Sequence, residues 1–400
     1  MHEMDSLKET LFTKSFVANP YPAYAKLREG QPVTRVRLPD GQYAWFITRY
    51  EDALETLKNQ MFIKDYTKLD NTSYHDLEAV FRENMLFADM PDHKRLRGLV
   101  SKAFTPQMIA GMRERIQEIT DNLLDEISTE HEVDLIDVFA FPLPIIVICE
   151  ILGIPSEDRN KFRNWSNAII EASNGSTPQN IDSQRNEFIQ YLKERFAIVR
   201  KNPKEDLISK LVISELEEDK LTEKELYGIV SLLIVAGHET TVNFIGNSIM
   251  NLLELPDQLD LLKKHPELIN NALEETLRYN SPVEFSTSRW VREDMEFKGQ
   301  PMKKGELVIV VLNSANHDPD QFKDPEILDI TREKSKHLAF GKGIHTCLGA
   351  PLARLEGEIA ILSFFRRYPN ATLNINKQDL EWRTGMIVRG VKKLPILLNN

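Results

Sequence analysis

The chain has 400 residues, of which 42% are hydrophobic and 28% charged, and its formal net charge is −11 at pH 7. This is the composition of an ordinary globular protein with a sizeable core. The acidic balance argues against a nucleic-acid-binding protein, because such proteins neutralise phosphates with clustered lysine and arginine.

The apolar runs at residues 145–154 and 229–236 are shorter than the ~18 residues that a membrane helix needs. Residues 1–10 are polar and lack the apolar core of a signal peptide. We therefore expect a cytoplasmic protein without a membrane anchor. Length alone would suggest more than one domain, but no linker or repeat divides the sequence, so we expect a single domain over residues 1–400.

In chain order, the first predicted element is a β-hairpin. Its strands, residues 33–38 and 43–48, flank the turn sequence Pro39-Asp40-Gly41. Residues 62–90 have no clean periodicity, and a long irregular stretch of this kind is often a binding loop or lid.

From about residue 92 to 280 the apolar spacing of three and four predicts mostly helix. Strand-like segments follow within residues 284–312, and a last helix is predicted over residues 350–367. The fold class expected is mainly α (α+β), with small β-sheets near the N-terminus and in the C-terminal half. The clearest central helices are predicted at residues 108–127, 183–200, 223–253 and 266–279.

The two cysteines lie in different surroundings. Cys149 lies inside an apolar run, where a cysteine acts as a small buried hydrophobic residue. Cys347 lies in the glycine-rich segment Phe340-Gly-Lys-Gly-Ile-His-Thr-Cys-Leu-Gly-Ala350, just before the last predicted helix. The N-terminus of a helix favours the thiolate, which is the form that binds metals. No further cysteines are available for a zinc or iron–sulfur site, so an axial ligand to haem and a catalytic nucleophile both stay open.

The segment resembles the haem-binding signature of bacterial cytochromes P450, Phe-Gly-x-Gly-x-His-x-Cys-x-Gly, at every fixed position, and its continuation to Glu356 matches as well. The resemblance extends from about residue 19 to 395 and is nearest to members that oxidise macrolides and polyketides. It implies the cytochrome P450 fold, a haem b cofactor and a Cys347 thiolate as the ligand of its iron.

The central helix is interrupted by Ala236-Gly-His-Glu-Thr-Thr241. Glycine and threonine are poor helix formers, so by itself the segment could be a polar surface face or a threonine pair bonded to the backbone. A zinc-binding His-Glu-x-x-His motif fails because Val242 stands where the second histidine is needed.

This segment also resembles the family's oxygen-activating motif. The resemblance implies that Gly237 opens a groove for dioxygen, that Thr240 hydrogen-bonds the bound oxygen and that Glu239 relays protons, as general acid catalysis requires. His238 stands at the variable position and receives no role.

Two charged sets are also implied by resemblance. Glu275 and Arg278, which alone could be an ordinary surface pair, match the family's Glu-x-x-Arg helix, and Arg332 matches its third, structural partner. The residues matching the family's haem-propionate ligands are His93, Arg97, Arg289 and His345. One departure is His317 in Ala315-Asn-His-Asp-Pro319, where the family has arginine in a structural turn.

The candidate substrate contacts, again by resemblance, are mostly apolar and suggest a lipophilic substrate, and plain core packing is the alternative for any one of them. They are Leu86, Phe87, Leu232, Ala236, Phe285, Thr287, Met386 and Ile387.

The reaction implied is insertion of one atom of dioxygen into a lipophilic small molecule, with two electrons from a separate ferredoxin or flavodoxin and its reductase. Such partners are commonly acidic, so we expect a local basic patch that includes Lys94, Arg95 and Lys342. A haem-thiolate sensor without turnover and a peroxide-driven oxygenase are the alternatives. The presence of both Glu239 and Thr240 argues against each.

Overall fold

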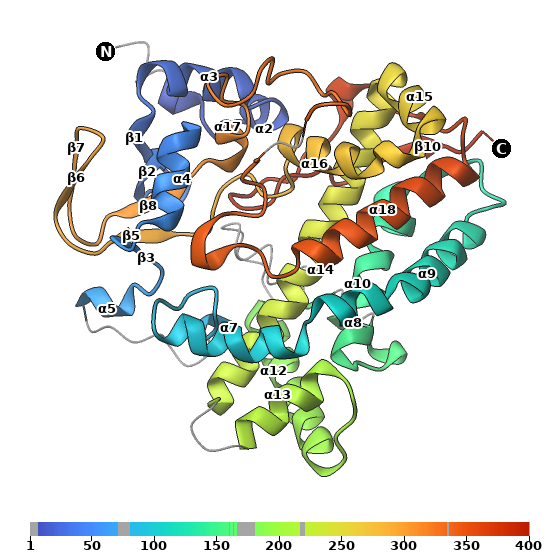
Figure 1. Ribbon diagram of the computed structural model, residues 1–400, viewed down its shortest axis with the longest axis horizontal. Coiled ribbons are helices and arrows are strands. Elements are labelled where there is room, and N and C mark those ends of the chain that lie inside the picture. The colour runs from blue at the N-terminus through green and yellow to red at the C-terminus, as the bar shows by residue number, and fades with distance from the viewer. Residues whose placement is uncertain are drawn as a thin grey trace. The chain divides into compact units, whose positions relative to one another are not determined.

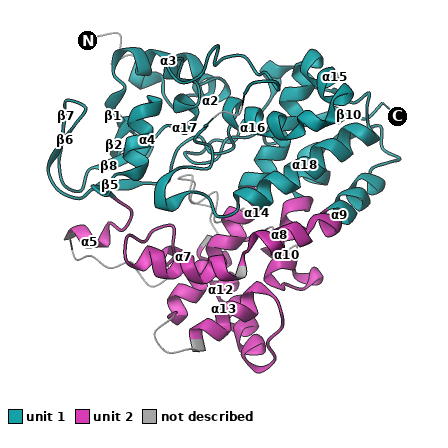
Figure 2. Ribbon diagram, in the orientation of Figure 1, with its two compact units in different colours: residues 1–62, 117–142, 240–400 teal, residues 63–116, 143–239 magenta. Residues whose placement is uncertain are grey.

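The structure is a computed structural model that describes residues 7–70, 81–159, 161–162, 164–165, 181–216, 221–333 and 336–399 (Figure 1). The chain folds into two compact units (Figure 2). Unit 1 comprises residues 1–62, 117–142 and 240–400, and unit 2 comprises residues 63–116 and 143–239. Within the irregular segment noted at residues 62–90, residues 71–80 lie outside the described part.

The main sheet has the strand order β1-β2-β8-β5-β3. The predicted hairpin is present: β1 (Val33–Arg37) pairs antiparallel with β2 (Tyr43–Ile47), and Gly41 has a φ of 87° in the turn between them. β2 pairs in parallel with β8 (Leu307–Val310), which pairs antiparallel with β5 (Arg289–Val291). The N-terminal hairpin is thus joined to strands more than 200 residues later, and β3 (Phe62–Ile63) completes the sheet.

Two smaller sheets also belong to unit 1. One has the order β4-β10-β9, formed by β4 (Glu132–Asp134), β10 (Pro395–Leu397) and β9 (Thr372–Leu373), and the other is the hairpin of β6 (Met295–Phe297) and β7 (Gln300–Met302). The helices of this unit are α2 (Lys14–Ala18), α3 (Tyr21–Gly30), α4 (Tyr50–Lys58), α15 (Pro256–Lys264), α16 (Ile269–Tyr279), α17 (Leu312–Ala315) and α18 (Ala350–Arg367), with a π-helical turn at Ile136–Ala140 and 3-10 turns at Pro266–Leu268, Gly343–His345 and Lys377–Asp379.

A buried hydrogen bond ties the first helices to the later strands of unit 1. The Tyr24 hydroxyl donates to Glu284 Oε1 at 2.6 Å, with both side chains buried. Burial raises the pKa of the Glu284 carboxyl. Phe46 and Phe285 pack beside this bond, with ring centroids 5.3 Å apart. Residues far apart in sequence therefore share one core.

The helix α14 (Glu223–Glu254) is continuous through the segment with glycine and two threonines. Among the described residues it is the one helix long and apolar enough to cross a membrane by length and composition. Protein buries 67% of its most apolar window, which is typical of a core helix.

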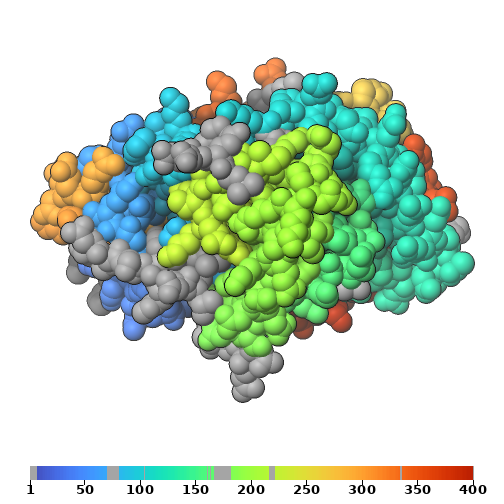
Figure 3. All heavy atoms as spheres, turned by 90° about the horizontal axis from the view of Figure 1, so that it is seen from below, coloured from blue at the N-terminus to red at the C-terminus, as the bar shows by residue number. Residues whose placement is uncertain are grey.

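Unit 2 is helical. Its aromatic side chains Phe162, Trp165 and Phe188 pack together, with the Phe162 and Trp165 centroids 5.1 Å apart. Figure 3 shows the outer surface of α12 and α13 in green. The helices are α5 (Thr67–Asp70), α7 (Asp92–Ala103), α8 (Pro106–Gly111), α10 (Pro142–Leu152), α12 (Ile181–Lys201) and α13 (Leu207–Leu216), with a 3-10 turn at Ser156–Asp158; α9 (Arg113–Glu126) runs from this unit into unit 1.

The predicted fold class, mainly α with small β-sheets, is confirmed. The helix at residues 350–367 has the predicted bounds, and α14 differs from its prediction by one residue. The helix predicted at residues 108–127 is wrong in one respect, because it divides into α8 and α9 at Met112. Apolar spacing continues through this bend because both helices bury residues, Ile109 in α8 and Ile116 in α9.

Candidate functional site

The cysteine loop of unit 1 lies between the 3-10 turn Gly343–His345 and α18. Gly341 and Gly343 have φ values of 67° and 78°, which favour glycine. A Cβ on Gly343 would lie 2.7 Å from the Leu57 carbonyl oxygen, so only glycine lets the loop pack on the end of α4. The Cys347 N–H donates to the Phe340 carbonyl at 2.9 Å and closes the loop.

Cys347 is exposed, whereas Cys149 is fully buried as predicted, and burial raises the pKa of the Cys149 thiol to about 12. The described residues contain no group of three or more His, Cys, Asp or Glu side chains able to hold a metal ion. A metal held by Cys347 would therefore need its other ligands from a cofactor, as a porphyrin provides them. An accessible sulfur just before a helix N-terminus, in a glycine-rich loop, fits haem ligation.

Glu275 is the centre of a buried charge cluster in unit 1. Arg278 donates to its two carboxylate oxygens at 2.8 Å each, and Arg332 Nε donates to the same carboxylate at 3.0 and 3.1 Å. Arg278 also donates to the carbonyls of Asn316, Pro325 and Ile327. The structure brings together the three residues that the sequence placed in one set and fixes the segment that precedes the cysteine loop.

The helix α14 carries Glu239 and Thr240 as neighbours, Glu239 buried and Thr240 half-buried. On the same helix, Leu232 is half-buried and Ala236 is exposed. Residues 232, 236 and 240 are spaced by four, so they share one partly accessible face of α14.

Gly237 has a packing role that the sequence did not indicate. A Cβ at this position would lie 3.0 Å from Ile148 Cγ1, so the glycine allows α14 and α10 to approach closely within unit 2. His238 is also buried, and its Nδ1 lies 2.7 Å from the Ile234 carbonyl.

The predicted propionate ligands are placed as follows. In unit 1, Arg289 is buried at the start of β5 and His345 ends the 3-10 turn two residues before Cys347. In unit 2, His93 and Arg97 lie four residues apart on α7, with His93 buried and Arg97 half-buried. Burial, followed by the charge of Arg97, lowers the pKa of His93, which favours the neutral imidazole.

Two predicted substrate-contact segments of unit 1 lie side by side. The Glu284 N–H donates to the Ile387 carbonyl at 2.9 Å, and Val283 pairs with Val388. Thr287, Met386 and Ile387 are half-buried. Phe285 differs, because its side chain is 2% exposed and fills the core beside Phe46. In unit 2, Leu86 and Phe87 are half-buried, and the Arg82 guanidinium lies 5.1 Å from the centroid of the Phe87 ring.

Sequence reasoning missed a second charge cluster of unit 1, formed by Glu274, His337 and Arg354. The Glu274 carboxylate accepts a 2.6 Å hydrogen bond from Arg354 Nε, and His337 Nε2 lies 3.2 Å from it. These partners are 80 and 63 residues from Glu274 in sequence, so no local pattern indicates them. The one available signal was a second glutamate directly before Glu275.

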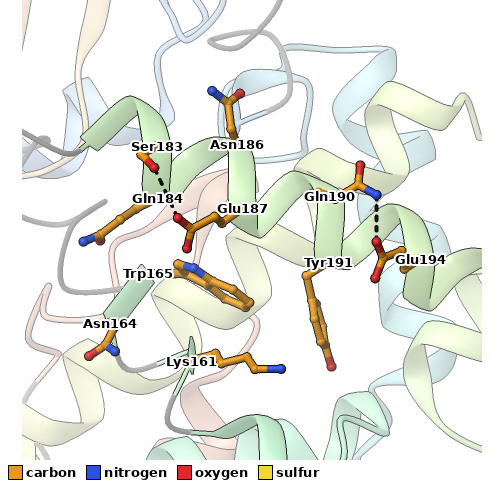
Figure 4. A pocket seen from close by; sticks show the side chains of 10 residues that line it. All are labelled: Lys161, Asn164, Trp165, Ser183, Gln184, Asn186, Glu187, Gln190, Tyr191 and Glu194. Carbon is orange, nitrogen blue, oxygen red and sulfur yellow. Dashed lines mark hydrogen bonds between the residues drawn. The ribbon is translucent and has the colours of Figure 1, made fainter.

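A pocket of about 690 Å³ opens on unit 2 beside α12 (Figure 4). Its lining mixes aromatic and polar side chains and contains none of the residues that the sequence singled out for function. The lining residues are Lys161, Asn164, Trp165, Ser183, Gln184, Asn186, Glu187, Gln190, Tyr191 and Glu194.

Comparison with known proteins identifies the family. Residues 11–182 and 258–396 match the family model described as "Cytochrome P450". The chain is 42% identical to the polyketide biosynthesis cytochrome P450 PksS of Bacillus subtilis, covering 96% of this chain and 97% of that protein. It is 41% identical to the cytochrome P450 monooxygenase PikC of Streptomyces venezuelae, covering 96% and 92%.

Solved structures agree with this result. The fold matches the myxobacterial cytochrome P450 CYP267B1, solved in complex with myristic acid, with a TM-score of 0.93 and 39% identity, covering 98% of this chain and 99% of that chain. The sequence match, the shared fold and the exposed thiol of the signature loop lead to one conclusion. The chain belongs to the cytochrome P450 family and is a haem b-dependent monooxygenase of lipophilic small molecules.

Proposed function

We propose that residues 1–400 act as one haem-thiolate monooxygenase domain that hydroxylates or epoxidises a polyketide-like molecule, with Cys347 as the ligand of the haem iron. The observation that carries this proposal is the exposed Cys347 sulfur just before α18, in a loop that matches the family signature. The family match includes residues of both units. When bound, the haem supplies the binding and activation of dioxygen.

Four cationic or hydrogen-bonding residues are proposed to hold the two haem carboxylates: Arg289, His345, His93 and Arg97. Arg289 is buried on a strand and so is held in place by the sheet. The neutral His93 ring, favoured by burial, can donate one hydrogen bond, and Arg97 supplies charge four residues along α7. Glu275, Arg278 and Arg332 are proposed to act structurally, by fixing the segment before the cysteine loop.

Thr240 and Glu239 are proposed to serve proton delivery. The half-buried Thr240 hydroxyl can accept and donate hydrogen bonds at the accessible face of α14. The buried Glu239 carboxyl can take up and release a proton directly or through water. The reaction needs protons at a site from which bulk water is excluded, so an acid next to an alcohol on one rigid helix is a suitable arrangement.

The substrate contacts proposed are the half-buried or exposed members of the predicted set: Leu86, Phe87, Leu232, Ala236, Thr287, Met386 and Ile387. Phe285 is proposed to support Thr287 from the core, since its own ring is buried. The apolar character of these residues fits a lipophilic molecule. The similarity to PksS, which is named for polyketide biosynthesis, supports a polyketide-like substrate.

The two electrons are proposed to come from a separate ferredoxin or flavodoxin with its reductase. The match to PksS covers 96% of this chain and 97% of PksS, so the two chains are similar in length. Neither Cys149 nor Cys347 forms a disulfide, which is compatible with the reducing cytoplasm that we propose as the site of action.

The test is the absorption spectrum of the reduced, carbon monoxide-bound protein. We expect the spectrum of thiolate ligation for the unaltered chain and its loss in Cys347→Ala, with Cys149→Ala as the matched control that keeps it. The proposal fails if Cys347→Ala keeps the thiolate spectrum. If the thiolate spectrum depends on Cys347, screening lipophilic compounds for changes in the haem spectrum of the unaltered chain identifies the substrate class.

A further inference from the structure

The guanidinium of Arg354 lies over Phe340, the residue that closes the cysteine loop. Arg354 is on α18, and its Cζ is 4.5 Å from the centroid of the Phe340 ring. The Phe340 carbonyl accepts the hydrogen bond from the Cys347 N–H. A cation on an aromatic face is attracted by the ring. Arg354 therefore stabilises the position of Phe340, whose carbonyl accepts the hydrogen bond from Cys347.

Glu274 fixes the orientation of that guanidinium. Arg354 Nε donates to Glu274 Oε1 at 2.6 Å, and Arg354 Nη2 donates to Oε2 at 2.9 Å. This two-point geometry is the strong form of an arginine–carboxylate pair. Burial opposes ionisation of Glu274, but the hydrogen bonds from His337 and Arg354 lower its pKa to about 2. Glu274 is therefore a full negative charge beside Arg354 at neutral pH.

His337 completes the cluster as a hydrogen-bond donor. Its Nδ1 accepts a hydrogen bond from the Ala339 N–H at 3.2 Å, so the ring proton is on Nε2, which lies 3.2 Å from Glu274 Oε2. The His337 side chain is 3% exposed. Its ring centroid is 6.0 Å from that of Phe340, so His337 and Arg354 both contact the start of the loop.

We propose that Glu274, Arg354 and His337 form a positioning triad that holds the cysteine loop and sets the reduction potential of the haem bound through Cys347. The proposal rests on Cys347 being the haem ligand, as proposed above. Arg354 contributes a positive charge near the thiolate, and Glu274 partly offsets it. The hydrogen bonds of Glu274, and to a smaller extent the charge of Cys347, raise the pKa of Arg354, in agreement with a field shared between these groups.

The charges predict effects of opposite sign. Removing the Arg354 cation in Arg354→Met stabilises the ferric haem and lowers the reduction potential. Removing the Glu274 anion in Glu274→Gln leaves the Arg354 cation unbalanced and raises the reduction potential. We expect each change to alter the ferrous-to-ferric ratio at fixed potential by roughly tenfold, as for one charge near a partly buried site. In the double variant, we expect the reduction potential to return towards that of the unaltered protein.

The experiment is a spectroscopic redox titration of the haem-loaded full chain, with the carbon monoxide spectrum recorded in parallel. Arg367→Met is the matched control, because Arg367 also lies on α18 and pairs with an exposed carboxylate, that of Asp125 at 2.7 Å. We expect no shift in this control. A purely structural cluster would instead release haem or lose the thiolate spectrum in both variants, without opposite shifts.

Arg354→Lys separates charge from position. Lysine keeps the positive charge but cannot form the two-point pair, so we expect a potential near that of the unaltered protein and a larger fraction without thiolate ligation. If Arg354→Met does not hold haem, Arg354→Lys and Glu274→Gln still supply the comparison. Shifts of the same sign, or no shift, in variants that keep the thiolate spectrum would overturn the triad alone. Failure of the proposed function is a different result: the Cys347→Ala protein would then keep the carbon monoxide spectrum of the unaltered chain.

Discussion

Arg278 and Glu275 form a two-point ion pair, with both hydrogen bonds at 2.8 Å, in which their side chains are 0% and 2% exposed. An exposed pair of the same spacing on a helix contributes little to stability. Here water is excluded from both charges, so each depends on the other and on the surrounding carbonyls. Arg278 therefore connects α16 to the segment that precedes the cysteine loop.

Replacing Arg278 by alanine leaves the Glu275 carboxylate buried, with Arg332 as its remaining cationic partner in the described part of the chain. We expect a loss of about 3–5 kcal/mol in the free energy of unfolding, the usual cost of breaking a buried pair, together with loss of haem. Thermal denaturation and the haem content of the purified variant measure both effects. Arg332→Ala is the comparison, and it should cost less because the Arg332 side chain is 15% exposed. Equal stability of Arg278→Ala and the unaltered chain would contradict this account.

Thr240→Ala tests the proposed role of the hydroxyl in oxygen activation. Alanine is the best helix former, so α14 should remain intact and the haem spectrum unchanged. We expect NAD(P)H to be consumed with redox proteins and substrate present, but with most electrons released as peroxide and not recovered in product. The control is Thr241→Val, because Thr241 is buried on the adjacent position of the helix. Full coupling in Thr240→Ala would refute the role assigned to Thr240.

The predicted redox-partner patch is tested at Lys342. Lys342 is exposed, Ile344 beside it is 46% exposed, and their loop packs on the backbone of Leu57 and Lys58. Lys58 is also exposed, so Lys58 and Lys342 present positive charge next to an apolar residue.

We expect the double change Lys58→Glu and Lys342→Glu to slow reduction by an acidic ferredoxin by roughly tenfold and to weaken its salt dependence. Stopped-flow reduction measured at several ionic strengths provides the test, with Lys393→Glu near the C-terminus as control. Unchanged rates would count against the patch. Two further residues of the predicted patch lie in unit 2. Arg95 is a weaker candidate for contact with the redox partner because it already pairs with Glu225. Lys94 is exposed and remains a candidate.

His317, which stands where the family has arginine, predicts a dependence of stability on pH. It is fully buried against Tyr21, with ring centroids 4.2 Å apart. Burial, followed by the charge of Arg278, lowers its pKa to about 3, against about 6.5 in the unfolded chain. Below pH ~6.5 the unfolded state binds a proton that the folded state does not, so this residue lowers stability as pH falls.

We therefore expect His317→Gln to lose less stability than the unaltered chain between about pH 6.5 and pH 4. The thermal midpoint of the haem-loaded protein, measured across this range, checks the difference. His131→Gln is the control, since His131 is exposed and should leave the slope unchanged. Parallel curves for His317→Gln and the unaltered chain would show that His317 is not the group responsible.

The sequence could predict what depends on neighbours along the chain. Apolar spacing located α14 and α18 to within a residue because a buried helix face repeats every three or four residues. The Pro39-Asp40-Gly41 turn located the hairpin for a similar local reason. The family signature around Cys347 also consists of consecutive residues, so it could be recognised without a structure. The division at Met112 was missed because both α8 and α9 continue to bury apolar residues across the bend.

By itself, the sequence determined the fold class, the family and the position of the signature loop around Cys347, because these are specified by short, contiguous patterns. Only the tertiary structure decided which charges meet and which side chains are buried. It paired Glu274 with Arg354 and His337, placed Phe285 in the core and neutralised His317. Hydrogen bonds and desolvation depend on distances between residues that are far apart in sequence, and these distances exist only once the chain has folded.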